Sequence, residues 1–71
     1  MFRIDNQSRT PVFEQIVHQA EEYVRTGILK PGDKLPSIRE LTSLIGVNPN
    51  TIQKAYNELD RRGVTVSVAG K

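Results

Sequence analysis

The sequence predicts a small, mainly helical domain in which three helices precede a short strand. Apolar residues recur every three or four positions through residues 11–26, 37–45 and 49–62, which is the spacing of one buried helix face. After Gly63 the period changes, because valines alternate with polar residues through 64–68, as in a strand with one buried face. The predicted fold class is therefore mainly α with one small β-element, and residues 1–71 are expected to form one domain.

The first helix is predicted from its ends and its apolar face. Thr10 is expected to be the N-cap residue, with Pro11 at the first helical position, where no N–H is needed. Gly27 is expected to end the helix, and Ile28 to fold back onto it as the apolar contact of a Schellman motif. The buried face comprises Phe13, Ile16, Val17, Ala20 and Val24. The other side is rich in acidic residues, so this helix is expected to form a wall of the core and to face away from a polyanion.

Two shorter segments flank this helix. Phe2 and Ile4 alternate with charged residues, so a short extended piece is predicted at the N-terminus. The Pro-Gly-Asp sequence at 31–33 is a strong turn signal. We expect residues 34–35, which follow it, to make a brief strand contact.

The second and third helices are predicted to be joined by a tight turn. Ser37 and Glu40 have the spacing of a capping box, in which each side chain satisfies a backbone N–H at the helix start. Gly46 suits the left-handed conformation that ends a helix. Asn48 is the predicted N-cap residue of the next helix, with Pro49 at its first position. Two short helices with a glycine-containing turn are typical of a helix-turn-helix.

The third helix is predicted to have one buried side and one hydrogen-bonding side. The buried side comprises Ile52, Ala55, Tyr56 and Leu59. The polar side comprises Asn50, Gln53, Lys54, Asn57 and Arg61. Asparagine and glutamine can pair with the major-groove edge of adenine, and recognition helices usually touch bases near their N-terminal end. A merely solvated surface is the alternative for any amphipathic helix, but the amide-rich side and the preceding short turn favour DNA reading.

The composition excludes several other classes of function. A 71-residue chain is too small to hold a large enzyme cleft, and it contains no catalytic constellation. It has no cysteine, so neither a disulfide framework nor a thiolate metal site is expected, and the single histidine, His18, is expected at the surface. We therefore predict no enzyme activity, no cofactor, no metal site and no membrane segment. Six basic and three acidic residues lie from Lys34 onward, against four basic and five acidic residues before it, which hints at a polyanionic partner.

The central sequence resembles a known family. The run from Gly27 to Gly63, GILKPGDKLPSIRELTSLIGVNPNTIQKAYNELDRRG, is similar to the N-terminal domain of the GntR family of bacterial transcription regulators. The resemblance covers about Pro11 to Lys71. The Pro-Val-Phe-Glu-Gln-Ile and Val-Asn-Pro-Asn-Thr segments resemble the YtrA-like branch of the family most closely.

This resemblance implies a winged helix-turn-helix of a transcription regulator that binds a palindromic DNA operator as a homodimer. We expect the regulator to be a repressor, and the absence of cysteine fits a cytoplasmic protein. The strand at 64–68 would then begin a wing that is truncated here. The family's second half, which dimerises and senses a small-molecule effector, is expected to be absent.

The resemblance also implies which residues contact DNA. Those of the helix-turn-helix are Arg39 on the second helix and Asn48, Asn50, Thr51 and Gln53 at the start of the third. Gly70, at the tip of the wing, is expected to enter the minor groove. Phosphate contacts are expected from Arg39, Lys54 and Lys71, with a secondary one from the capping residue Ser37. Pro49 stands where many relatives have an arginine or a similar polar residue, so a different base specificity is expected.

Two alternatives to this function stay open at the level of sequence. The domain could be the DNA-binding headpiece of a regulator with an aminotransferase-like half that binds pyridoxal phosphate. It could also be a winged domain used only for protein–protein contact, in which case an exposed apolar patch would form the interface.

Overall fold

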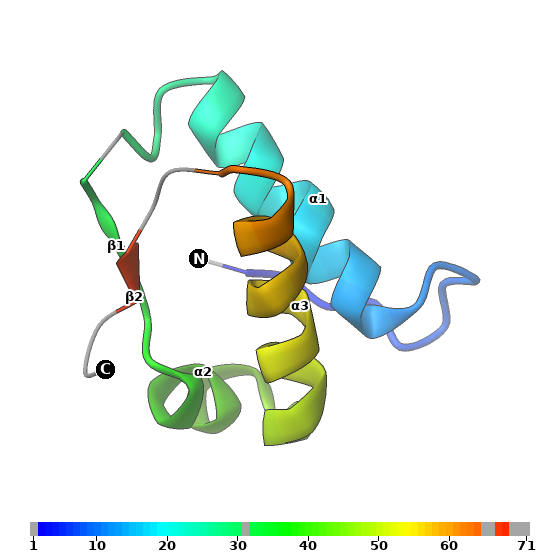
Figure 1. Cartoon of the computed structure of the whole chain (residues 1–71). Coiled ribbons are helices and arrows are strands. Elements are labelled where there is room, and N and C mark those ends of the chain that lie inside the picture. The colour runs from blue at the N-terminus through cyan, green and yellow to red at the C-terminus, as the bar shows by residue number, and fades with distance from the viewer. Residues whose placement is uncertain (1, 31, 65–66, 69–71) are drawn as a thin grey trace.

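The structure is a computed structural model that describes residues 2–30, 32–64 and 67–68. Its elements follow in the order α1 (Val12–Arg25), β1 (Lys34–Leu35), α2 (Ile38–Ile45), α3 (Pro49–Arg61) and β2 (Ser67–Val68). Figure 1 shows α3 beside α1, with α2 across the lower end of α3 and the two strands at the left of the view, above α2. Each helix lies within one residue of its predicted bounds, and the fold is the predicted three-helix arrangement with a small β-element.

The core is formed by the predicted apolar faces of all three helices. α3 packs against both α1 and α2, so it lies at the centre of the fold. Its four predicted core residues are buried, as are the middle of the α1 face and Leu41 of α2. The buried residues are Phe2, Ile16, Val17, Ala20, Leu29, Leu35, Leu41, Ile52, Ala55, Tyr56 and Leu59. Phe13 and Val24 of α1, and Ile38 and Ile45 of α2, are partly buried against this cluster.

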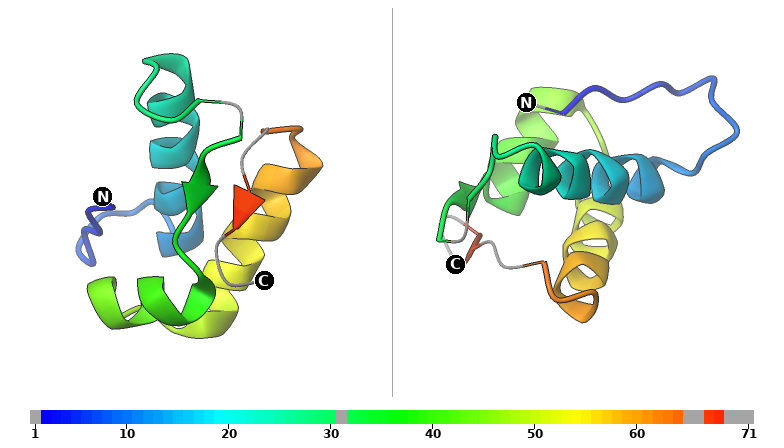
Figure 2. Two further views of the ribbon diagram at one scale, coloured as in Figure 1. Left: turned by 90° about the vertical axis from the view of Figure 1, so that its left-hand side faces the viewer. Right: turned by 90° about the horizontal axis from the view of Figure 1, so that it is seen from above.

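The strands join the connector before α2 to the chain that follows α3. β1 and β2 pair in parallel, with Lys34 opposite Ser67 and Leu35 opposite Val68. Figure 2 shows the two strands side by side in its left panel. The expected strand contact of residues 34–35 is therefore confirmed. Leu35 is buried, so this pairing also anchors the segment that leads into α2.

Both ends of α1 differ in detail from the prediction. Thr10 is not the N-cap residue. Pro11 takes that position, because its carbonyl accepts the first helical hydrogen bond, from the Gln15 N–H, and no side chain caps the helix start. Ile28 does not fold back and is 63% exposed. Leu29 is the inward residue instead, 4% exposed, and its N–H donates to the Tyr23 carbonyl at 2.9 Å. The second residue after Gly27, and not the first, is therefore the one whose side chain faces the core.

The N-terminal extended segment is held on α1 by two glutamine side chains. The Gln19 amide accepts from the Arg3 N–H and donates to the Arg3 carbonyl, at 2.8 and 2.5 Å. The Gln15 amide does the same with the Asp5 backbone, at 2.8 and 2.9 Å. Gln15 and Gln19 are four positions apart, which is a rise of about 6 Å along a helix, and their partners are two positions apart, which is about 6.6 Å along an extended chain. The spacing of the two glutamines therefore matches that of the backbone groups they bind. The predicted extended piece is thus confirmed, and it places Phe2 in the core.

We expect Gln19→Ala to lower the free energy of unfolding by about 1–2 kcal/mol, because two intramolecular hydrogen bonds are lost at once. Urea denaturation of the 71-residue chain measures this difference. His18→Ala is the matched control, since His18 is exposed on the same turn of α1, and it should change stability by less than about 0.5 kcal/mol. Equal stability of the two variants would show that the glutamine pairing contributes nothing.

Candidate nucleic-acid interface

The start of α2 is fixed by the predicted capping box. The Ser37 hydroxyl oxygen accepts from the Glu40 N–H at 3.1 Å, and the Glu40 carboxylate accepts from the Ser37 N–H at 3.4 Å. The Ser37 hydroxyl still has its own proton to donate. A capping role and a contact to an acceptor such as a phosphate oxygen are therefore compatible at this residue.

The turn between α2 and α3 also has the predicted chemistry. Gly46 ends α2 with a φ of +65°, a conformation that a side chain would strain, and its N–H donates to the Thr42 carbonyl. The Asn48 side-chain oxygen accepts from the Asn50 N–H at 2.8 Å, and Pro49 occupies the first position of α3. Asn48 therefore uses its oxygen as a cap, which leaves its NH₂ group as the part that can contact a ligand.

A buried tyrosine links α3 to the start of α2. The Tyr56 hydroxyl donates to the Pro36 carbonyl at 2.7 Å, and the ring is buried in the core. Burial raises the pKa of Tyr56 to about 12, so the hydroxyl keeps its proton at any physiological pH. Because the acceptor directly precedes the capping box of α2, this bond fixes the two helices relative to each other.

The first turns of α3 present the predicted polar side to solvent. Asn50 and Gln53 are exposed, and Thr51 is half-buried. The Gln53 side-chain NH₂ donates to the Asn57 side-chain oxygen at 2.8 Å. One N–H and the carbonyl oxygen of the Gln53 amide remain for a partner, which is the pair of groups that adenine recognition requires.

Lys54 has a contact that the sequence pattern did not reveal. Its ammonium nitrogen lies 4.0 Å from the centre of the Phe13 ring, on α1. The sequence analysis assigned Phe13 to the core, but the residue is only partly buried, and its ring supports an exposed cation. No signal within one helix could predict this, because the two residues are 41 positions apart in the chain.

The C-terminal end of α3 carries compensated arginines. Glu58 accepts from Arg61 at 3.0 Å and from Arg62 at 2.7 Å, and Arg62 also reaches Glu21 of α1 at 3.1 Å. Hydrogen bonds from the two arginines lower the pKa of Glu58 to about 2. The sequence pattern counted Arg61 among the cations of the polar side, but a carboxylate of the same helix neutralises it.

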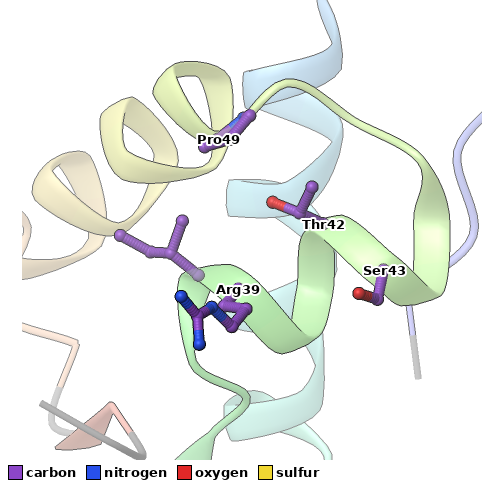
Figure 3. Close-up of a pocket in the computed structure, with 5 residues that line it drawn as sticks. Arg39, Thr42, Ser43 and Pro49 are labelled. Atoms are coloured by element: carbon purple, nitrogen blue, oxygen red, sulfur yellow. The ribbon is translucent and has the colours of Figure 1, made fainter.

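A hollow lies between α2 and the start of α3. It has a volume of about 460 Å³ and opens to solvent. Figure 3 shows Arg39, Thr42 and Ser43 on α2 and Pro49 at the start of α3 around it. Ile38 is the fifth lining residue. Arg39 is exposed and forms no ion pair with another described residue, so its charge is available beside the first turn of α3.

The structure thus brings most of the predicted site together on α2 and the N-terminal half of α3. These residues are Ser37, Arg39, Asn48, Asn50, Thr51, Gln53 and Lys54. The other two predicted residues, Gly70 and Lys71, lie outside the described residues. Within the described part of the chain there is no cluster of side chains suited to a metal ion and no helix that could cross a membrane.

Comparison with known proteins identifies the family. The model of the bacterial regulatory proteins of the gntR family matches residues 12–71. The chain belongs to the GntR family. It is 52% identical over 71 residues to the HTH-type transcriptional repressor YtrA of Bacillus subtilis, and the match covers the whole of this chain and 55% of that protein.

Two solved structures support the same assignment for this GntR domain. YtrA from Sulfolobus acidocaldarius, described as a GntR-family transcription factor, is 55% identical with a TM-score of 0.85, over 87% of this chain and 53% of that one. A transcriptional antiterminator from Listeria monocytogenes EGD-e is 52% identical with a TM-score of 0.87, over all of this chain and 53% of that one. The GntR domain therefore spans about half the length of these relatives.

We expect Glu58→Gln to flatten the acid dependence of stability of the GntR domain. The pKa of Glu58 is depressed from 4.5 to about 2 in the folded state, so its contribution is present above pH 4.5 and is lost as the pH falls toward 2. Urea denaturation between pH 2 and 6 measures this dependence.

Asp60→Asn is the control for this experiment, because Asp60 is an exposed carboxylate of α3 that forms no ion pair with another described residue. It should leave the pH dependence nearly unchanged. If Glu58→Gln kept the acid dependence of the parent chain, the arginine cluster would not stabilise the fold.

Proposed function

We propose that this GntR domain is the DNA-reading part of a cytoplasmic transcription repressor that binds a palindromic operator as a homodimer. The observation that carries the proposal is the exposed, amide-rich N-terminal half of α3, held from behind by its buried face. In this arrangement Asn50, Thr51 and Gln53 contact base edges in the major groove. Asn48 contributes its NH₂ group to the same surface.

The cations Arg39 and Lys54 and the hydroxyl of Ser37 would contact the sugar–phosphate backbone or neighbouring bases. Arg39 extends from α2, beside the first turn of α3, and Ser37 lies at the start of α2. Lys54 rests on the Phe13 ring, which limits the positions its ammonium can take. We further propose that Gly70 enters the minor groove, as the resemblance to the family implies, and that the cation Lys71 contacts a phosphate.

The two large apolar residues that are exposed in the described part of the chain do not form one interface. Ile28, 63% exposed, follows α1, whereas Leu44, 70% exposed, belongs to α2. The end of α1 and the helix α2 lie at opposite ends of the molecule in Figure 1. A purely protein-binding domain would be expected to expose one contiguous apolar patch. The polar half of α3 is therefore the better supported contact surface.

We expect Gln53→Ala to lose about 1–3 kcal/mol of discrimination between operator and scrambled DNA, because a bidentate amide–adenine pair is removed. The operator is first selected from random DNA with the full-length protein, and fluorescence anisotropy then gives both affinities. A variant that binds the two DNAs in the same ratio as the parent protein would remove Gln53 from the reading surface. If the parent itself bound both equally, the proposed function would be wrong.

Lys54→Ala should instead weaken binding to operator and scrambled DNA alike. Its slope of log affinity against log salt should be about 0.9 smaller than that of the parent, which corresponds to one phosphate contact. Arg61→Ala is the matched control: it removes a cation from the same helix, but one that Glu58 already neutralises. Its slope should equal that of the parent, and equal slopes for both variants would contradict the assignment of Lys54.

A further inference from the structure

We propose that the hollow between α2 and the start of α3 accepts the methyl group of a thymine, so that Pro49 and Thr42 determine base specificity by apolar contact. This inference rests on the proposed function and names one base that the site reads. The hollow is lined by Ile38, Arg39, Thr42, Ser43 and Pro49, and it adjoins the exposed end of α3. A duplex contacted by α3 would therefore face it.

The lining favours an apolar group over a hydrogen-bonding one. Pro49 has neither a side-chain donor nor an acceptor, and its backbone has no N–H. The Thr42 hydroxyl oxygen is buried and has no hydrogen-bond partner among the described residues, so it offers no accessible polar atom to a ligand. Ile38 adds a half-buried aliphatic side chain. Arg39 and Ser43 also line the hollow, but they are exposed, so their polar ends can stay in solvent. Water against the Pro49, Thr42 and Ile38 walls finds few partners, so its displacement by an apolar group is favourable.

Among the four bases, thymine alone presents a methyl group in the major groove. A hollow of about 460 Å³ that opens to solvent can receive this methyl together with part of the base edge. Arg39 lies at the same hollow and would remain free to contact a neighbouring guanine or phosphate. Contact between Pro49 and a thymine methyl group thus provides base specificity, although the proline side chain can form no hydrogen bond.

The test uses the operator selected with the full-length protein. Each thymine is replaced in turn by deoxyuridine, which lacks the methyl group but keeps the pairing, and anisotropy gives the affinity. We expect one thymine in each half-site at which the replacement weakens binding about fourfold, which corresponds to about 0.8 kcal/mol for one buried carbon group. At that position 5-methylcytosine should bind more tightly than cytosine by a similar factor.

Two variants assign the effect to the hollow. Pro49→Ala removes one wall, and Thr42→Ser removes only a methyl group and keeps the hydroxyl, so a change in folding with one variant does not decide the outcome. Both should reduce the fourfold effect to less than twofold. Arg61→Ala is the matched control on the same helix as Pro49, because Arg61 is paired with Glu58 away from the hollow and its removal should keep the full response to deoxyuridine.

The outcomes separate this inference from the proposed function. If the protein binds its operator specifically but no thymine responds to deoxyuridine, the inference is wrong and the function stands. The inference is also wrong if the fourfold effect persists in both Pro49→Ala and Thr42→Ser. If operator and scrambled DNA bind equally, both the function and the inference fail.

Discussion

The burial of one side of α3 is the constraint on which the rest of the structure depends. Ile52, Ala55, Tyr56 and Leu59 lie in the core between α1 and α2, so α3 cannot rotate without exposing them. Burying a side chain of the size of Ile52 or Leu59 contributes about 1.5–3 kcal/mol, whereas an exposed amide contributes little to folding. The fold therefore determines which residues face solvent, and the outward side of α3 is free to serve a partner.

Electrostatic interactions divide the outward side of α3 into two parts. Near its C-terminal end, Glu58 pairs with Arg61 and Arg62, and Arg62 also pairs with Glu21, so Arg62 joins the end of α3 to α1. Near its N-terminal end the cations have no carboxylate partner among the described residues: Arg39 is exposed and Lys54 rests on an aromatic ring. The chain as a whole has a net charge of only +2, yet two cations without a carboxylate partner among the described residues lie beside the amides. A polyanion would be attracted to that part of the surface.

Local chemistry explains why much of the fold could be predicted from the sequence. The capping box at Ser37, the left-handed Gly46 and the Asn48–Pro49 helix start are each determined by a few neighbouring residues, and all three are confirmed. Helical spacing likewise predicted the buried side of α3.

Contacts between distant segments could not be predicted in this way. The Gln15 and Gln19 bonds to the N-terminal backbone, the Lys54–Phe13 contact and the Arg62–Glu21 pair each join different elements. The hollow beside Pro49 has the same origin, because its walls come from two helices whose packing angle is not visible in either helix alone. The prediction that Ile28 folds back was wrong for the same reason, since tertiary packing decides which of the two adjacent residues, Ile28 or Leu29, turns inward.

The central claim is that the N-terminal half of α3 lies against nucleobases while its buried side stays in the core. An NMR titration of the isotope-labelled 71-residue chain with the selected palindrome tests it most directly. The account predicts that amide shifts concentrate at residues 37–39 and 48–54, and that the acidic side of α1 is unchanged. Shifts on the acidic side of α1, with residues 48–54 unaffected, would contradict it.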